Sequence, residues 1–141
     1  DTSTAMIEQA RVRHPAARFD VLASPPWLTG PDASVDLVIL FAVLTCVPDD
    51  AAQRALIGEL RRVLRPGGTL YLSDLLLQRD KQYDCTGVFE TSDGAVCRHH
   101  TSDWLVELLA GFTVAGTRRI SVATMNGNRA DGIQLLARKS A

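Results

Sequence analysis

The fold of this chain is decided by the stretch Val35-Asp36-Leu37-Val38-Ile39-Leu40-Phe41-Ala42-Val43-Leu44, which is apolar at every position but one. A strand that is apolar on both faces is typical of a parallel sheet covered by helices on both sides. A helical pattern follows over residues 50–64, and residues 69–74 are typical of a second strand. This order predicts an α/β domain whose ligands bind at the carboxyl ends of its strands.

Other patterns extend this unit in both directions. Pro15 ends a helical pattern that begins after Ser3 or Thr4, and the Pro- and Gly-rich loop that contains Trp27 is expected to let this side chain pack onto the domain. The expected elements are a helix at 3–13, a strand at 17–23, a hairpin of 87–90 with 95–98, a helix from Thr101 to Gly111, and closing strands at 112–122 and 133–137 joined by a turn at 125–128.

Composition limits the class of protein. The chain has 141 residues, the size of one domain, and 46% of them are hydrophobic, which is enough for a sizeable core. The net charge of −1 gives no electrostatic support for a nucleic-acid or membrane partner. No apolar run reaches the roughly 18 residues of a membrane span, and no signal peptide is visible. We therefore expect a single domain over residues 1–141 in the cytoplasm.

The cysteines agree with that location. Cys46, Cys85 and Cys97 are odd in number and form no C-x-x-C pair. Free thiols in a reducing cytosol are therefore expected, rather than a disulfide framework or a zinc site. No His, Cys, Asp and Glu set in the sequence has the spacing of metal ligands.

Polar side chains follow both apolar strands. Thr45 and Cys46 come after the first strand, and Ser73 and Asp74 end the second. Asp74 is either a catalytic carboxylate or a cap for the segment that follows it. No G-x-G-x-x-G or P-loop motif occurs, and Gly67-Gly68 lies at the amino end of a strand, where it turns the chain.

Two adjacent histidines, His99 and His100, precede the helix expected at Thr101. A histidine in a cleft is a natural general base, and a histidine pair in a loop is also a common structural or solvent-facing feature. The residues alone leave both interpretations open.

The segment Leu60-Arg61-Arg62-Val63-Leu64-Arg65-Pro66-Gly67-Gly68 and its flanking strands resemble the middle of a class I S-adenosylmethionine-dependent methyltransferase of type 11/12. The Leu-rich helix that ends in Ala110-Gly111-Phe112 is similar to the helix before the sixth strand of that family. The resemblance implies a Rossmann-like, mostly parallel sheet with helices on both faces, ordered 3-2-1-4-5-7-6 with strand 7 antiparallel. It also implies S-adenosylmethionine as the cofactor and methyl transfer to a small-molecule substrate.

The same resemblance implies a set of site residues. The acidic residue that holds the ribose hydroxyls corresponds to Asp1, and the place of an adenine-contacting Asp is taken by Ala23-Ser24. The implied cofactor neighbours are Asp1, Thr2, Ala23, Ser24, Phe41 and Ala42, and the candidates for lining the acceptor side are His99, His100 and Tyr83, with no catalytic residue assigned.

The family's first strand, Gly-rich loop, first helix and second strand have no counterpart in this sequence. Without them the strand at 37–44 has an exposed apolar edge, which predicts aggregation or a homodimer. Three explanations stay open: the sequence is the C-terminal two-thirds of a full domain, it is a truncated form that pairs through this edge, or the alignment of Asp1 is wrong.

Two other functions compete with methyl transfer. One is a non-catalytic, methyltransferase-like fragment that acts as a homodimer or interaction module. The other is a nicotinamide dehydrogenase on a related α/β fold, which the missing glycine fingerprint disfavours.

Overall fold

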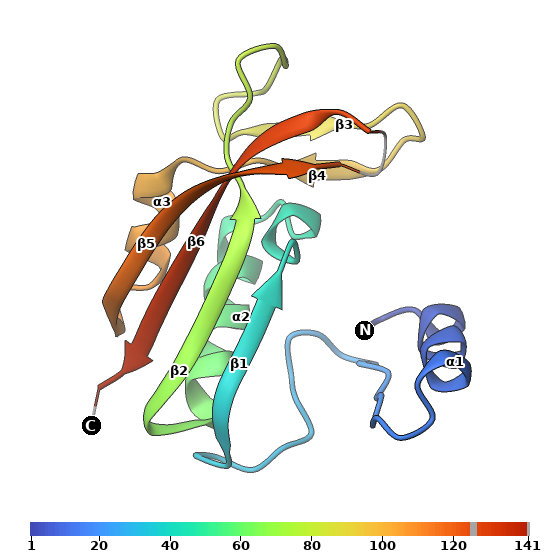
Figure 1. Ribbon diagram of the computed structural model, residues 1–141, viewed down its shortest axis with the longest axis vertical. Helices are drawn as coiled ribbons and strands as arrows, with labels where there is room; N and C mark the ends of the chain where they lie inside the picture. The colour runs from blue at the N-terminus through green and yellow to red at the C-terminus, as the bar shows by residue number, and fades with distance from the viewer. Residues whose placement is uncertain (125–126, 141) are drawn as a thin grey trace.

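The computed structural model describes residues 1–124 and 127–140, and its centre is a four-stranded sheet in the order β1-β2-β6-β5 (Figure 1). The strands are β1 (Val35–Phe41), β2 (Leu64–Leu75), β5 (Phe112–Ala123) and β6 (Arg129–Lys139). β1 pairs with β2 in parallel, and β6 is antiparallel to both of its neighbours. This order confirms the expected Rossmann-like arrangement, with β6 in the place of the antiparallel strand 7. The turn expected at 125–128 includes Met125 and Asn126, which lie outside the described residues.

Helix α2 (Asp50–Val63) forms where the periodicity predicts it. Asp49 caps it by accepting a hydrogen bond from the Ala52 N–H at 2.8 Å, and Arg61 and Arg62 lie in its last turn, where cations favour the helix dipole. Its apolar face packs against the sheet, with Ile57 and Leu60 buried in the core.

The Arg65-Pro66-Gly67-Gly68 segment is an irregularity inside β2. Val35 pairs with Leu64 and Leu37 pairs with Thr69, so residues 65–68 lie opposite Asp36 alone. Gly67 has a φ of +74°, and a Cβ on Gly68 would lie 2.8 Å from the Arg65 carbonyl oxygen. The glycines therefore do turn the chain, but β2 begins before this turn and not at residue 69 as expected.

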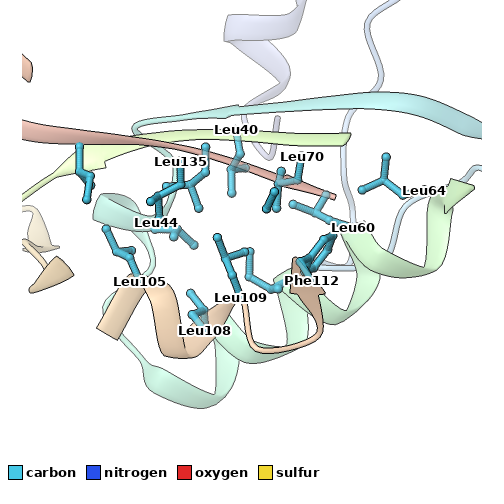
Figure 2. Close-up of a cluster of buried hydrophobic side chains, with 14 of the residues drawn as sticks. Leu40, Leu44, Leu60, Leu64, Leu70, Leu105, Leu108, Leu109, Phe112 and Leu135 are labelled. Atoms are coloured by element: carbon cyan, nitrogen blue, oxygen red, sulfur yellow. The ribbon is translucent and has the colours of Figure 1, made fainter. Parts of the chain in front are cut away.

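The core is a layer of leucines between the sheet and two helices, α2 and α3 (Ser102–Leu108), as Figure 2 shows. Thr101 caps α3 as expected, with its side chain accepting from the Trp104 N–H at 3.1 Å. Leu44, Leu70, Leu105 and Leu135 are completely buried in this layer. Burial of each such side chain stabilises the fold by about 1.5–3 kcal/mol.

The N-terminal part lies beside the edge of β1, on the side away from β2 (Figure 1). Ser3 caps α1 (Thr4–Arg13), which buries only Ile7. The strand expected at 17–23 is wrong, because this segment is irregular. Its main-chain bonds to the start of the chain involve Asp1 alone: the Leu22 N–H donates to the Asp1 carbonyl, and the Asp1 amino group donates to the Asp20 carbonyl. A strand requires a continuous ladder partner, which the described residues do not offer here.

The loop before β1 docks on α2 through Leu28, and the packing expected for Trp27 is wrong because that side chain is 65% exposed. The Leu28 N–H donates to Glu59 at 2.8 Å, and Arg62 pairs with both Glu59 and Asp32. These hydrogen bonds lower the pKa of Glu59 to about 2. Arg62, in the last turn of α2, therefore has a structural role.

A segment of irregular chain with a short hairpin, β3 (Val88–Glu90) and β4 (Val96–Arg98), connects β2 to α3. It lies at the end of the sheet where β1 and β2 terminate, above the 3-10 turn η1 (Leu44–Cys46) that follows β1 (Figure 1). The pairing of β3 with β4 confirms the expected hairpin. The hairpin lies over the carboxyl ends of β1 and β2, where ligands bind in α/β folds. None of the described helices has the length and hydropathy needed to cross a membrane.

We expect Leu105→Ala to lower the free energy of unfolding by about 2–5 kcal/mol, because it leaves a cavity in a fully buried position between α3 and the sheet. Val106→Ala on the same helix is the matched control, since Val106 is 45% exposed and should change stability by less than about 0.5 kcal/mol. Urea denaturation followed by circular dichroism measures both. Equal effects of the two variants would contradict the placement of α3.

Candidate functional site

The chain leaves β1 through a residue in an unusual backbone conformation. Ala42 has a φ of +51°, and its N–H donates to the Ser73 carbonyl on β2 at 2.8 Å. A residue other than glycine in this region costs about 1–3 kcal/mol and is often found at functional sites. Next to it, the half-exposed Phe41 ring contacts Tyr71 edge to face. Both residues expected near the methionine part of the cofactor thus lie at the carboxyl end of β1.

Asp74 ties this turn to β2. Its carboxylate is completely buried and accepts hydrogen bonds from the Leu75 N–H at 2.8 Å and the Thr45 N–H at 3.4 Å. Burial raises the pKa of Asp74 to about 6. Of the two roles considered for Asp74, these contacts match the capping role, because the carboxylate is closed off from solvent.

Thr45 connects the same turn to the hairpin. Its hydroxyl donates to the Arg98 carbonyl at 2.7 Å. The buried Arg98 side chain in turn donates to the Pro48 carbonyl, pairs with Asp50 and lies over the Trp104 ring. β4, the start of α2 and α3 are therefore held together around one arginine.

Gln53 is a central residue of this cluster that sequence reasoning missed. Its amide nitrogen lies 2.7 Å from the Val47 carbonyl, 3.2 Å from the Leu44 carbonyl and 2.8 Å from His100 Nε2, and its oxygen accepts from Trp104 Nε1 at 2.7 Å. Because the amide nitrogen only donates, His100 Nε2 accepts and the ring proton is on Nδ1. The available signal was its position on the apolar face of α2.

His100 faces the interior. Its Nδ1 lies 3.7 Å from Asp74 Oδ1, both side chains are fully buried, and Nδ1 has no hydrogen-bond partner among the described residues. Burial lowers the pKa of His100 to about 4, so the ring is neutral near pH 7. His100 thus completes the buried cluster with Gln53 and Asp74.

His99, in contrast, pairs with Tyr83. Their Nδ1 and Oη atoms are 2.6 Å apart, and Tyr83 Oη also accepts from the Gln78 N–H at 3.0 Å. Burial lowers the pKa of His99 to about 4, so the ring is neutral near pH 7. Phe89 packs on His99 with ring centroids 4.6 Å apart. The structure therefore brings together two of the three acceptor-side candidates.

The start of the chain carries the remaining cofactor candidates. Asp1 Oδ1 accepts from the Ser3 N–H at 2.8 Å, and the Asp1 carbonyl accepts from the Leu22 N–H, which places Asp1 and Thr2 near Ala23-Ser24. Within residues 1–124 and 127–140, no hydrogen bond joins this group to Phe41 or Ala42. The exposed carboxylate retains acceptor capacity for a ribose diol, so its chemistry fits a nucleoside cofactor.

No group of three or more His, Cys, Asp or Glu side chains in the described part of the chain could hold a metal ion. The three cysteines are free, as the sequence predicts.

Asp74 and His100 should affect acid stability in opposite directions. The folded-state pKa of Asp74 is above its ordinary 3.8, so protonation between about pH 6 and 4 favours the folded state. The folded-state pKa of His100 is below its ordinary 6.5, so acidification from about pH 6.5 to 4 favours the unfolded state. Relative to the wild type, Asp74→Asn should therefore lose stability more steeply on acidification and His100→Gln less steeply. Urea denaturation at each pH measures this, and the double variant should remove both slopes. Two single variants whose curves run parallel to the wild type would contradict the assignment.

The sequence of this chain is similar to those of known methyltransferases. The model of a family described as a methyltransferase domain matches residues 1–72. The trans-aconitate 2-methyltransferase of Methylobacterium radiotolerans is 40% identical over 70 residues, which are 50% of this chain and 25% of that protein. The tRNA N(3)-cytidine methyltransferase METTL2 of Gallus gallus is 35% identical over 97 residues, which are 64% of this chain and 25% of that protein. The chain thus spans about a quarter of the length of these curated relatives.

Solved methyltransferase structures also superpose on this chain. A SAM-dependent methyltransferase from Methanosarcina mazei superposes with a TM-score of 0.88 at 25% identity, covering 99% of this chain and 80% of that one. A Burkholderia thailandensis 1,6-didemethyltoxoflavin-N1-methyltransferase, solved with S-adenosylhomocysteine, shares the fold with a TM-score of 0.68 at 19% identity, over 98% of this chain and 57% of that one. From the family match, the sheet order and these superpositions, the chain belongs to the methyltransferase domain family.

Proposed function

We propose that residues 1–141 act as a single methyltransferase domain in S-adenosylmethionine-dependent methyl transfer to a small molecule. The observation that carries the proposal is the family match over residues 1–72, which spans both Asp1 and the strained turn at Ala42. Strain at the carboxyl end of a strand that pairs in parallel supports a ligand site at that end of the sheet.

The cofactor would be held by the two groups of residues described above. Asp1 would accept the ribose hydroxyls, and the small side chains of Ala23 and Ser24, with Thr2, would leave room for the adenine. Phe41 and Ala42 would border the methionine part. When bound, S-adenosylmethionine supplies an electrophilic methyl group, and the protein accelerates the displacement chiefly by orienting the two reactants.

On the acceptor side we propose His99 and Tyr83 as lining residues. They lie in the segment that covers the sheet edge and are already hydrogen-bonded to each other. A base is required only if the attacking nitrogen, oxygen or carbon must lose a proton. His100 is proposed as a supporting residue, because both of its ring nitrogens face buried groups.

A small-molecule acceptor is favoured over a nucleic acid by charge. The net charge is −1, whereas a protein that binds a polyanion carries a basic surface. The curated relatives are named for one acceptor of each kind, trans-aconitate and tRNA. Free cysteines, two of them exposed, support a reducing compartment and hence the cytoplasm.

We expect Asp1→Ala, made in the full-length natural protein, to weaken S-adenosylhomocysteine binding at least tenfold. A hydrogen bond to a charged group contributes about 1.5–3 kcal/mol, and the substitution removes the proposed ribose acceptor. Glu8→Ala on the exposed surface of α1 is the control and should leave the affinity unchanged. Calorimetric titration measures both affinities. Unchanged binding by the Asp1 variant would remove this residue from the cofactor site.

A second candidate function, an interaction module or homodimer, is favoured by one observation. Leu37, Ile39 and Phe41 are each at least half exposed on the β1 face opposite α2 and α3, and β1 is an edge strand. Exposed apolar edge strands pair readily with other chains. The partner proposed for this surface is a second copy of the chain.

Sedimentation velocity of residues 1–141 should detect a dimer if this second candidate is right, and Ile39→Lys should return it to a monomer. Glu8→Lys, which also adds a positive charge but lies far from β1 in sequence, is the control. A dimer that does not bind S-adenosylhomocysteine favours the module over the enzyme. A monomer at all concentrations would rule the dimer out.

A further inference from the structure

We propose that Thr45 is a positioning residue that couples the cofactor side of the site to the acceptor side. Through Thr45, binding at the turn after β1 would order the β3–β4 hairpin before the acceptor arrives. This inference rests on the proposed function and goes beyond it, because it assigns a role to a residue that contacts neither reactant.

Thr45 is bonded to both sides at once. Its N–H donates to Asp74 on β2, and its hydroxyl donates to the Arg98 carbonyl on β4 at 2.7 Å. Among the described residues, this hydroxyl makes the hydrogen bond that joins η1 to β4. This side-chain oxygen therefore links the two segments directly.

The link continues in both directions along the chain. Upstream, Thr45 follows Ala42, whose strained backbone is tied to Ser73. Downstream, the Arg98 carbonyl belongs to the peptide bond that leads into His99, whose ring is bonded to Tyr83. A shift of η1 thus acts directly on the peptide that orients His99.

The turn does not need the Thr45 hydroxyl to keep its own shape. Gln53 holds the Val47 carbonyl at 2.7 Å and lies within reach of the Leu44 carbonyl, and Asp74 accepts from the Thr45 backbone. Removing the hydroxyl should therefore uncouple the hairpin from η1 and leave η1 folded.

The other hydrogen bonds that anchor the hairpin segment reach β2 and α2 rather than η1. The His99 N–H bonds to Gly87 within the same segment, and the His100 N–H bonds to Leu75 at 3.1 Å. The Arg98 side chain reaches Pro48 and Asp50, at the start of α2, and not η1. Gln53 also lies between η1 and this segment, since it reaches the Leu44 carbonyl and His100 Nε2. The Thr45 bond differs in joining η1 to β4 itself, and the proposal therefore assigns the coupling of the hairpin to this bond.

The test is hydrogen–deuterium exchange of the full-length natural protein with and without S-adenosylhomocysteine. In the wild type the ligand should slow exchange at least threefold in peptides covering residues 42–47 and in those covering 86–98. Thr45→Val, which keeps the side-chain shape, should keep the first effect and lose the second, with affinity for the ligand changed by less than threefold. Thr45→Ser should restore both.

Thr113→Val, the same exchange at an exposed position on β5, is the matched control and should behave as the wild type. If Thr45→Val fails to fold, Thr45→Ala replaces it in the same measurement. Ligand protection of residues 86–98 that survives both substitutions overturns the coupling and leaves the proposed function standing. A wild type that does not bind S-adenosylhomocysteine overturns the proposed function itself, and the coupling with it.

Discussion

The leucine layer between the sheet and the two helices on it constrains the polar groups around it, because a buried polar group is costly unless it is hydrogen-bonded. Gln53 enters from α2 and is completely buried. Both ends of its amide are occupied, by backbone carbonyls and His100 on one side and by Trp104 on the other. The backbone after β1 and the residues after β4 therefore supply the hydrogen-bond partners of Gln53, and these contacts set the geometry of the site.

Periodicity was sufficient to predict the elements that carry their own signal. β1, α2 and α3 are continuous apolar or amphipathic runs, and all three form. β1 ends at Phe41 and not at Leu44 as expected, and α3 ends at Leu108, before the expected stop at Gly111. The segment at 17–23 is different, because a strand depends on the partner beside it, which a pattern in one segment does not contain. Trp27 and Leu28 are likewise two adjacent apolar residues in a loop, and the sequence does not show which of them packs on the core. In the structure Leu28 does, and Trp27 is exposed.

The candidate site was predictable as a region but not in its internal arrangement. The carboxyl ends of β1 and β2 were the expected place, and the polar cluster lies there. His99 and His100 were indistinguishable by type and neighbourhood, yet successive side chains of an extended segment point to opposite sides. One meets Tyr83 and the other meets Gln53. Only the three-dimensional packing decides which histidine faces which environment.

The two tryptophans of this chain lie in opposite surroundings, and this gives the protein an optical property. Trp27 is mostly exposed to solvent, whereas the Trp104 ring lies against the guanidinium groups of Arg54 and Arg98, each 4.8 Å from its centre, and donates to Gln53. Trp104 is half-buried, and a half-buried indole emits at shorter wavelength than an exposed one because fewer water dipoles relax around it. The blue part of the intrinsic fluorescence therefore reports the buried cluster at the site, and the red part reports the loop before β1, without any label attached to the protein.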